Sequence, residues 1–409
     1  MKLLITLALR NLRRNLRRTI ITLLAIAIGL VVMLLGLCLQ TGSYQEMINS
    51  GVSQIAGHVV VQKKGYQEER EPLMILEDSQ QITQTLKETF PNATITQRAF
   101  LAGLLTSPKG PAAVSIIAVG SAEEKISPFK KKLIDGDWLD DNPQSIVIGS
   151  NMAQTLGVDI GEKVVFTAQF DSSEMKSHLF RVRGIFRMGS PEADSFIAYA
   201  NLGMTKSFFE QKDASHQIAV HLDDVHQSFV ATQTTQTKIT LPDLDILSWK
   251  EALPDIDKMI QVDQQSNSAV HFVLAIIVAM GILNTMLMSV LERTKELGVL
   301  IAIGMKPRQL SIMVMLEGLF LGIFGSILGV ILGYIACYPL VVYGLDMTPK
   351  MGESYDAAGV TISAMIYGAY NWNSIILYAI LAAVFSTLTA IYPAYKITTL
   401  KPVEAMRHH

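Results

Sequence analysis

Four long apolar stretches divide the chain. Each extends for about 20 residues or more with almost no charged side chain, whereas charged and polar residues are frequent elsewhere. An α-helix rises about 1.5 Å per residue, so about 20 apolar residues are needed to cross the roughly 30 Å hydrocarbon core of a bilayer. The pattern therefore predicts four transmembrane helices, at residues 19–41, 268–291, 310–342 and 374–395.

The long segment between the first two spans, residues 42–265, has a different pattern. Short runs rich in β-branched residues predict strands, and two longer runs predict helices. The expected strands are residues 57–62, 145–149, 163–167, 180–186 and 195–199, and the expected helices are residues 79–90 and 151–156. The predicted fold is thus a membrane protein with four transmembrane α-helices and an α+β extracytoplasmic domain between spans 1 and 2.

The distribution of charge predicts how the spans are oriented. Residues 1–18 carry six basic side chains and no acidic one, whereas residues 42–265 carry 20 Lys and Arg against 29 Asp and Glu. The net charge of the chain is −2, so residues 42–265 contribute −9 and the remainder contributes +7. Because basic loops stay in the cytoplasm, we expect both termini there. Residues 1–18 are then a cytoplasmic amphipathic segment, 292–308 a cytoplasmic loop and 396–409 a cytoplasmic tail.

Polar residues and glycines inside the predicted spans predict contacts between helices. A carboxylate at the centre of a membrane costs on the order of 2.5–3.5 kcal/mol, so we expect Glu317 of the third span to face the bundle. Asn284 and Thr285 of the second span are its expected hydrogen-bond donors. Glycines at close helical spacing also predict tight packing of the third span. They are Gly318, Gly322, Gly325, Gly329 and Gly333.

Motifs of the common enzyme classes do not occur in the sequence. The chain has no G-x-S-x-G, H-E-x-x-H or C-x-x-C pattern, and no G-x-x-x-x-G-K-[ST] phosphate-binding loop. His216 and His221 point to opposite faces if they lie on one strand, so we expect no metal site there. The sequence predicts a non-catalytic chain without its own cofactor. If a nucleotide drives this protein, ATP and Mg²⁺ bind to a separate subunit.

The loop after the second span carries the most specific motif. Residues 292–304 read Glu-Arg-Thr-Lys-Glu-Leu-Gly-Val-Leu-Ile-Ala-Ile-Gly, and they closely resemble the signature of the FtsX-like permeases. Residues 9–19 resemble the opening motif of that module, and residues 393–407 resemble its closing motif. The segment 42–265 resembles the MacB-type periplasmic core domain. The chain is therefore similar to the type VII ABC transporter permeases, and most similar to their lipoprotein-releasing (LolC/LolE-like) branch.

This resemblance implies a mechanism of mechanotransmission. In such permeases the segment after the second span docks on a separate ATPase, and the first two spans transmit its ATP-driven closure to the outer domains. The matching residues are Glu292, Arg293, Glu296, Leu297, Gly298, Ile301, Ala302 and Gly304. We expect Leu297 and Ile301 to face the ATPase. The implied partners are an ATPase dimer, a second permease copy that is identical or related, a periplasmic carrier or adaptor, and membrane lipids, with no nucleic acid.

Three functions fit the resemblance. They are release of lipoproteins from the outer leaflet, MacB-like efflux of peptides or amphiphiles, and signalling that activates cell-wall hydrolases. The chain contains no fused ATPase and its outer segment is large, which favours the first. Acyl chains would then enter between the first two spans of paired subunits. The expected lining residues are Leu35, Leu39, Ile276 and Met280.

Overall fold

The computed structural model of this protein describes residues 2–171, 174–209, 214–239 and 241–398. The chain divides into two compact units, which are described separately below. Unit 1 contains residues 1–44, 261–345 and 366–409, and unit 2 contains residues 45–260 and 346–365. The connection between the third and fourth spans lies outside the inserted domain that the sequence predicts. Most of it nevertheless belongs to unit 2.

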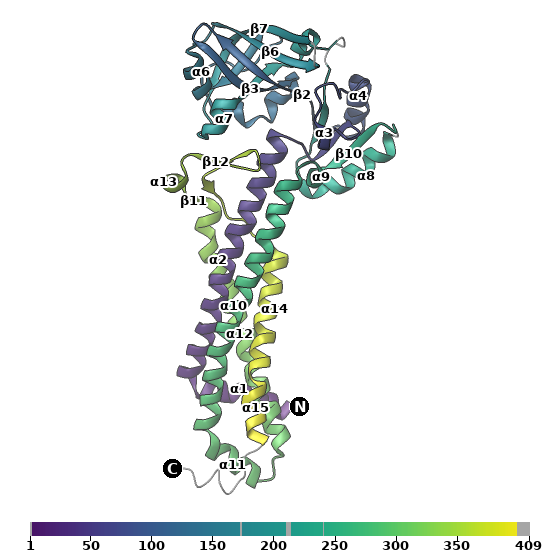
Figure 1. Ribbon diagram of the computed structural model, residues 1–409. Helices are drawn as coiled ribbons and strands as arrows, with labels where there is room; N and C mark the ends of the chain where they lie inside the picture. The colour runs from purple at the N-terminus through teal and green to yellow at the C-terminus, as the bar shows by residue number, and fades with distance from the viewer. Residues whose placement is uncertain (1, 172–173, 210–213, 240, 399–409) are drawn as a thin grey trace. The chain divides into compact units, whose positions relative to one another are not determined.

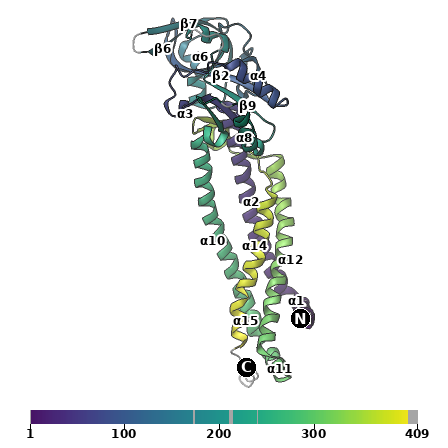
Figure 2. The same ribbon diagram turned by 90° about the vertical axis from the view of Figure 1, so that its right-hand side faces the viewer.

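Unit 1 is a bundle of long apolar helices that run side by side (Figures 1 and 2). Among the described residues, four helices are long and apolar enough to cross a membrane, as the sequence predicts. They are α2 (Leu16–Gln54), α10 (Pro254–Glu292), α12 (Pro307–Val342) and α14 (Trp372–Thr389), which α15 (Ile391–Thr398) continues. The shorter helices α1 (Lys2–Arg14) and α11 (Thr294–Ala302) lie at one end of this bundle.

Close contacts along α12 explain why this helix is rich in glycine. A Cβ atom added at Gly322 would lie 2.9 Å from Ala383 Cα of α14. One added at Gly329 would lie 2.9 Å from Leu30 Cδ2 of α2. Larger residues would therefore push α12 away from both neighbours, since small residues are what allow helix backbones to approach closely in lipid. The predicted tight packing of the third span is confirmed.

Unit 2 is built on a mixed β-sheet (Figure 1). Over the described residues the sheet has ten strands in the order β10-β1-β9-β2-β3-β8-β5-β7-β4, and β6 pairs with both β2 and β7. The strands are β1 (Val59–Lys63), β2 (Thr94–Ser107), β3 (Gly110–Val119), β4 (Leu133–Gly136), β5 (Ser145–Gly149), β6 (Lys163–Asp171), β7 (Glu174–Phe186), β8 (Ile197–Asn201), β9 (Gln217–His221) and β10 (Leu244–Ser248).

Short helices and two small strand pairs complete the described fold. The helices are α3 (Tyr66–Glu69), α4 (Ser79–Thr89), α5 (Pro128–Lys131), α6 (Ser150–Leu156), α7 (Pro191–Phe196), α8 (Ser228–Lys238), α9 (Trp249–Ala252) and α13 (Thr348–Met351). Short 3-10 helices cover Ser121–Lys125, Leu202–Ser207 and Val225–Gln227. The strand pairs are β12 (Ser354–Ala357) with β13 (Val360–Ser363), and β11 (Leu345–Asp346) with β14 (Met365–Ile366).

The sheet carries the core of unit 2. Val59 and Val61 of β1 share a face, because side chains alternate along a strand, and this face packs against Ile82 and Leu86 of α4. A larger cluster around Phe166 joins β2, β3 and β5–β8 to α6. The predicted α+β domain is confirmed, although the sequence does not predict the long β2–β3 hairpin.

Three histidines of unit 2 are buried as neutral rings. Backbone N–H groups donate to ring nitrogens: Leu222 N lies 3.0 Å from His58 Nδ1, and Phe100 N lies 3.0 Å from His216 Nδ1. These nitrogens can accept only while they are unprotonated. Burial lowers the pKa of His58 and of His216. Burial, followed by the charge of Arg98, lowers the pKa of His221 well below its ordinary value.

We expect these histidines to make the protein sensitive to mild acid. The unfolded chain binds protons that the folded chain excludes, so stability is complete above about pH 6.5 and falls below it. The loss approaches about 1.4 kcal/mol per pH unit for each histidine that must become charged. Denaturant unfolding of the detergent-solubilised chain between pH 8 and pH 5 measures this slope. His221→Gln should make the slope shallower, whereas His226→Gln at an exposed position should not; equal slopes would contradict the assignment.

Candidate coupling site

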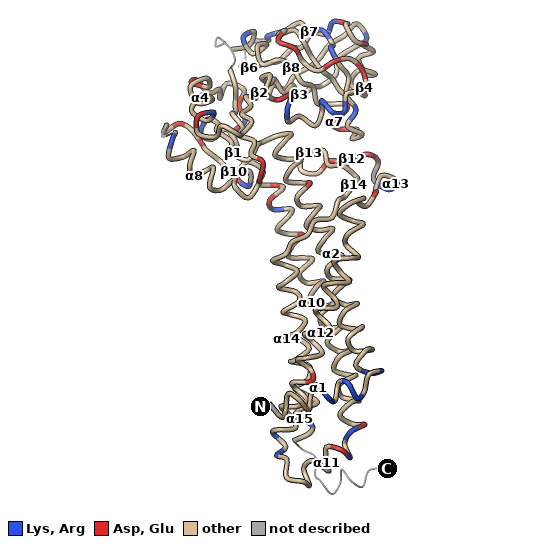
Figure 3. The backbone as a smooth tube through the Cα atoms, turned by 180° about the vertical axis from the view of Figure 1, so that it is seen from behind, with Lys and Arg blue, Asp and Glu red and all other residues tan. Residues whose placement is uncertain are grey.

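Charged residues gather at the end of unit 1 that carries α1 and α11 (Figure 3). Helix α1 packs against α12 there. Its residues Leu4, Ala8 and Leu12 recur every four positions, so they share one face, and this face is buried in the apolar cluster of unit 1. Arg10 and Arg13 are exposed. The N-terminal segment is therefore an amphipathic helix whose apolar face covers part of the bundle.

Glu317 of α12 is the buried acidic group of this region, with 2% of its surface exposed. Asn11 Nδ2 of α1 donates to Glu317 Oε1 at 2.7 Å, and Arg293 Nη1 approaches the same oxygen at 3.4 Å. A buried carboxylate costs several kcal/mol unless a counter-charge and hydrogen bonds compensate it. Asn11 and Arg293 provide both, and they tie α1, α12 and the α10–α11 turn together.

The predicted partners of Glu317 are wrong, although its predicted burial is right. Thr285 Oγ1 donates to the Gly281 carbonyl of its own helix at 2.8 Å, and Asn284 is exposed. The partner Asn11 comes from α1, which the sequence alone does not place against α12. One signal for it exists: Asn11 follows Ala8 by three positions, so it is a polar residue on the otherwise apolar face of α1.

Glu296 extends the charged network to the surface. Arg293 Nε donates to Glu296 Oε2 at 3.2 Å, and Arg14 of α1 forms a further ion pair with this carboxylate. The hydrogen bond from Arg14, supported by that from Arg293, lowers the pKa of Glu296. Exposed ion pairs contribute little stability, so the significance of this contact lies in connecting α1 to α11.

Helix α11 presents a different face from the one that the sequence predicts. Leu297 is only 2% exposed, and it packs in the apolar cluster of unit 1 rather than facing outward. Ile301 is half-buried. The apolar residues that do face outward are Val299 and Ile303, which are 46% and 79% exposed. The expectation for Leu297 is therefore wrong, because the bundle itself covers this side of α11.

The other predicted coupling residues surround this helix. Glu292, Ala302 and Gly304 are exposed, and Gly298 is buried. Gly304 has φ +106°, a conformation that favours glycine, and it ends the turn that leads into α12. Much of the resembling C-terminal motif, residues 399–407, lies outside the described residues.

In unit 2 the end of α2 is held by a buried ion pair. Arg98 of β2 and Glu123 are fully buried and form a two-pronged pair, with distances of 3.0 and 2.7 Å. Arg98 Nη2 also donates to the Ser53 carbonyl in the last turn of α2 at 2.8 Å. The last carbonyls of a helix lack partners inside the helix, and a cation also complements the helix dipole there. Arg98 thus fixes the end of α2 to the sheet.

Two glutamines strengthen this attachment. Gln217 Nε2 of β9 donates to the Ile55 carbonyl just beyond α2 at 2.6 Å. Gln54 donates to the Thr361 carbonyl of β13 at 2.7 Å and accepts from Thr361 N at 3.0 Å. The hairpin of β12 and β13 and the main sheet therefore both hold the same end of α2. Neither Arg98 nor these glutamines is singled out by any motif in the sequence.

The four predicted acyl-lining residues lie on two helices. Ile276 and Met280 of α10 are 42% and 65% exposed, so they face away from their own bundle. Leu35 and Leu39 of α2 are half-buried. Their role as a lining between paired subunits stays a prediction.

Two family models match the chain. The FtsX-like permease C-terminal model matches residues 268–402, and the MacB-like periplasmic core domain model matches residues 19–238, more than half of the chain. The chain belongs to the LolC/MacB type of ABC transporter permease. The helix α11, Arg293 and Glu317 thus lie within the FtsX-like part of this permease, and the contact between Arg98 and Ser53 lies within its MacB-like domain.

Relatives of this permease include proteins named LolC and proteins named MacB. The lipoprotein-releasing system transmembrane protein LolC of Xylella fastidiosa is 23% identical over alignments covering 99% of this chain and 98% of that protein. A macrolide export ATP-binding/permease protein MacB of Chlorobium luteolum is 30% identical over 31% of this chain and 16% of that protein. The periplasmic region of MacB from Actinobacillus actinomycetemcomitans has a solved structure with 13% identity and a TM-score of 0.36, covering 52% of this chain and 94% of that one.

We expect replacement of Glu317 to weaken the fold of this permease. Glu317→Leu leaves the Asn11 amide without its acceptor and the buried Arg293 with Glu296 as its remaining counter-charge, which costs about 3–5 kcal/mol. Glu317→Gln can still accept from Asn11 but loses its charge, so we expect a smaller loss of about 1–3 kcal/mol. Denaturant unfolding in detergent measures both, with Glu292→Gln at an exposed position as the control. Wild-type stability of Glu317→Leu would show that the carboxylate is not a structural tie.

Proposed function

We propose that this permease releases lipoproteins from the outer leaflet of the bacterial inner membrane, driven by a separate ATPase dimer. ATP and Mg²⁺ bind to that ATPase, and a second permease copy completes the transporter. The similarity to LolC over almost the full length of both chains supports this cargo. The permease acts by transmitting movement, and its termini lie in the cytoplasm with unit 2 in the periplasm.

The observation that carries the proposal is the continuity of α2. This helix has 39 residues without a break, a length of about 58 Å, and it passes from unit 1 into unit 2. In unit 2 its last turn is fixed by Arg98, and in unit 1 its first turns follow α1, which Asn11 ties to Glu317. A helix that is held at both ends moves as one body, so a displacement of its cytoplasmic end displaces the periplasmic sheet.

The ATPase would bind on the exposed side of α11. Val299 and Ile303 are apolar and outward-facing, while Leu297 anchors the helix to the bundle. The ion pairs of Glu296 with Arg14 and Arg293 then connect this docking helix to α1 and α12. Movement of α11 would reach the spans through Arg293, which contacts both Glu296 and Glu317.

A second candidate function is MacB-like efflux. It is favoured by the family model of the MacB-like core domain and by the local identity to MacB of Chlorobium luteolum. The cargo would then be a soluble peptide or amphiphile rather than an acylated protein. The coupling geometry would be the same for both cargoes.

We expect Ile303→Asp to uncouple the transporter without unfolding it. A charge on this exposed apolar residue removes the contact with the ATPase but leaves the buried core unchanged. In proteoliposomes that contain the permeases and ATPase, ATP-dependent transfer of a triacylated lipoprotein to the soluble fraction should fall at least about tenfold, which corresponds to about 1.4 kcal/mol of binding. Phe229→Asp, at a 67% exposed position of α8, is the matched control.

Two outcomes would contradict the proposal in different ways. Wild-type transfer by Ile303→Asp would rule out docking at this face. ATP-dependent export of a peptide from proteoliposomes in which no lipoprotein is released would instead support the efflux function.

A further inference from the structure

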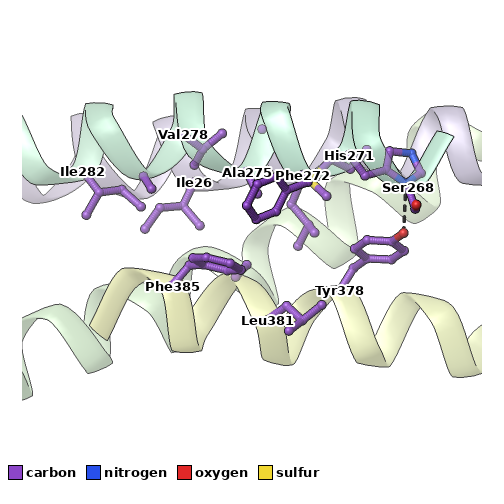
Figure 4. Close-up of a pocket in the computed structure, with 15 residues that line it drawn as sticks. Ile26, Ser268, His271, Phe272, Ala275, Val278, Ile282, Tyr378, Leu381 and Phe385 are labelled. Carbon is purple, nitrogen blue, oxygen red and sulfur yellow. Dashed lines mark hydrogen bonds between the residues drawn. The ribbon is translucent and has the colours of Figure 1, made fainter. Parts of the chain in front are cut away.

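A cavity of about 240 Å³ lies inside unit 1, between three of its spans. Helices α2, α10 and α14 supply its lining, which is mostly apolar (Figure 4). Ile26 and Leu30 of α2 and Ile282 of α10 are each no more than 2% exposed, so this part of the wall is closed. Phe272 of α10 and Leu381 of α14 are 58% and 38% exposed, so the cavity opens to the surface of unit 1 beside them. Such a cavity in a membrane helix bundle suits an apolar ligand.

Small residues create this space. Ala275 and Ala279 of α10 and Ala382 of α14 face the cavity where larger side chains would fill it. Gly29 of α2 closes one side, since a Cβ atom added there would lie 2.4 Å from Val278 Cγ2. Helices α2 and α10 are therefore in close contact at Gly29.

One end of the cavity is polar. His271 Nδ1 and Tyr378 Oη form a hydrogen bond of 2.8 Å, which Figure 4 shows at the end opposite Ile282 and Phe385. With the tyrosine hydroxyl donating to Nδ1, the other ring nitrogen, Nε2, carries a proton that it can donate. Nε2 makes no hydrogen bond to any residue that the structure describes.

The polar end of the cavity lies less than two helical turns from an aromatic cluster. Trp372 at the start of α14 stacks on Tyr334 and Tyr370, and such aromatic clusters mark the membrane–water interface. Tyr378 follows Trp372 by six residues on the same helix, so it lies about 9 Å deeper. His271 likewise lies near the beginning of the apolar part of α10, where this helix enters from unit 2.

We infer that this cavity binds a single acyl chain of an amphiphile, with the ester or amide carbonyl of that chain accepting a hydrogen bond from His271. The apolar body of the cavity takes the hydrocarbon, and the His271–Tyr378 pair takes the polar end. The chain comes from a phospholipid or from a lipoprotein, since both supply the same chemistry. The site borders the outward face of α10, because its lining residue Phe272 is 58% exposed and precedes Ile276 by four residues. It does not depend on which cargo the transporter releases.

The test uses the full chain in vesicles of phosphatidylethanolamine and phosphatidylglycerol. One arm includes a phosphatidylethanolamine with a photoreactive diazirine in one acyl chain, and the other includes a triacylated lipopeptide with the same group. After irradiation, mass spectrometry maps the labelled residues. We expect labelling at cavity residues of α10 and α14, such as Ala275 and Phe385. Labelling by phospholipid identifies a resident lipid, and labelling by lipopeptide identifies a cargo chain.

Variants distinguish this cavity from the lipid-facing surface. Ala279→Trp fills the cavity, so labelling at Phe385 should fall at least about fivefold, and Ala275→Leu provides a milder filling if the tryptophan disturbs folding. Met280→Trp, at the adjacent exposed position, should leave the labelling at Phe385 unchanged. Tyr378→Phe removes one hydrogen bond and should weaken labelling about two- to tenfold. Equal labelling of the wild type and both filled variants, or none in either arm, would overturn the inference.

Discussion

The carbonyl groups in the last turn of α2 need hydrogen-bond donors from elsewhere in the protein, and Arg98 supplies the central one. Its guanidinium donates to the Ser53 carbonyl while both of its other contacts go to the buried carboxylate of Glu123. Breaking such a buried pair by removing one partner costs about 3–5 kcal/mol, so this contact is difficult to lose in the folded state. The last turn of α2 is therefore held to β2, and the proposed transmission of movement depends on this contact.

The same physical requirement operates in unit 1. A buried carboxylate, Glu317, is compensated by Asn11 from α1 and by Arg293 from the turn before α11. Along α12, glycines let the spans pack closely, and at one of them Ser386 Oγ of α14 donates to the Gly318 carbonyl at 2.9 Å. The bundle thus combines the polar contacts of Glu317 with close packing of small residues along α12. The cavity beside His271 is a place where this close packing is interrupted.

The sequence predicts the parts of this structure that depend on local pattern. Four apolar stretches predict the spans, and the run of residues 292–304 indicates the FtsX-like family, because each signal lies within one continuous stretch. Contacts between distant segments are different: Asn11 meets Glu317 306 positions away, and no local pattern indicates this. The predicted outward face of α11 is wrong for the same reason. Packing against the bundle buries Leu297 and leaves Ile303 exposed. Nothing in the sequence distinguishes Arg98 from an exposed charged residue of a strand, and only the structure shows that it is buried.

The most direct test of the account measures movement of the sheet of unit 2 when the proposed ATPase partner binds nucleotide. Spin labels at Lys87, an exposed position of α4, in both permease copies would report the distance between the two domains by pulsed electron paramagnetic resonance. We expect this distance to change on addition of a non-hydrolysable ATP analogue. In the double variant Arg98→Met/Glu123→Leu, apolar packing replaces the ion pair and preserves the fold. The hydrogen bond to the Ser53 carbonyl is lost. The change should then be strongly reduced, whereas Arg187→Met at an exposed position should retain it. An unchanged response in the double variant would contradict transmission through the end of α2.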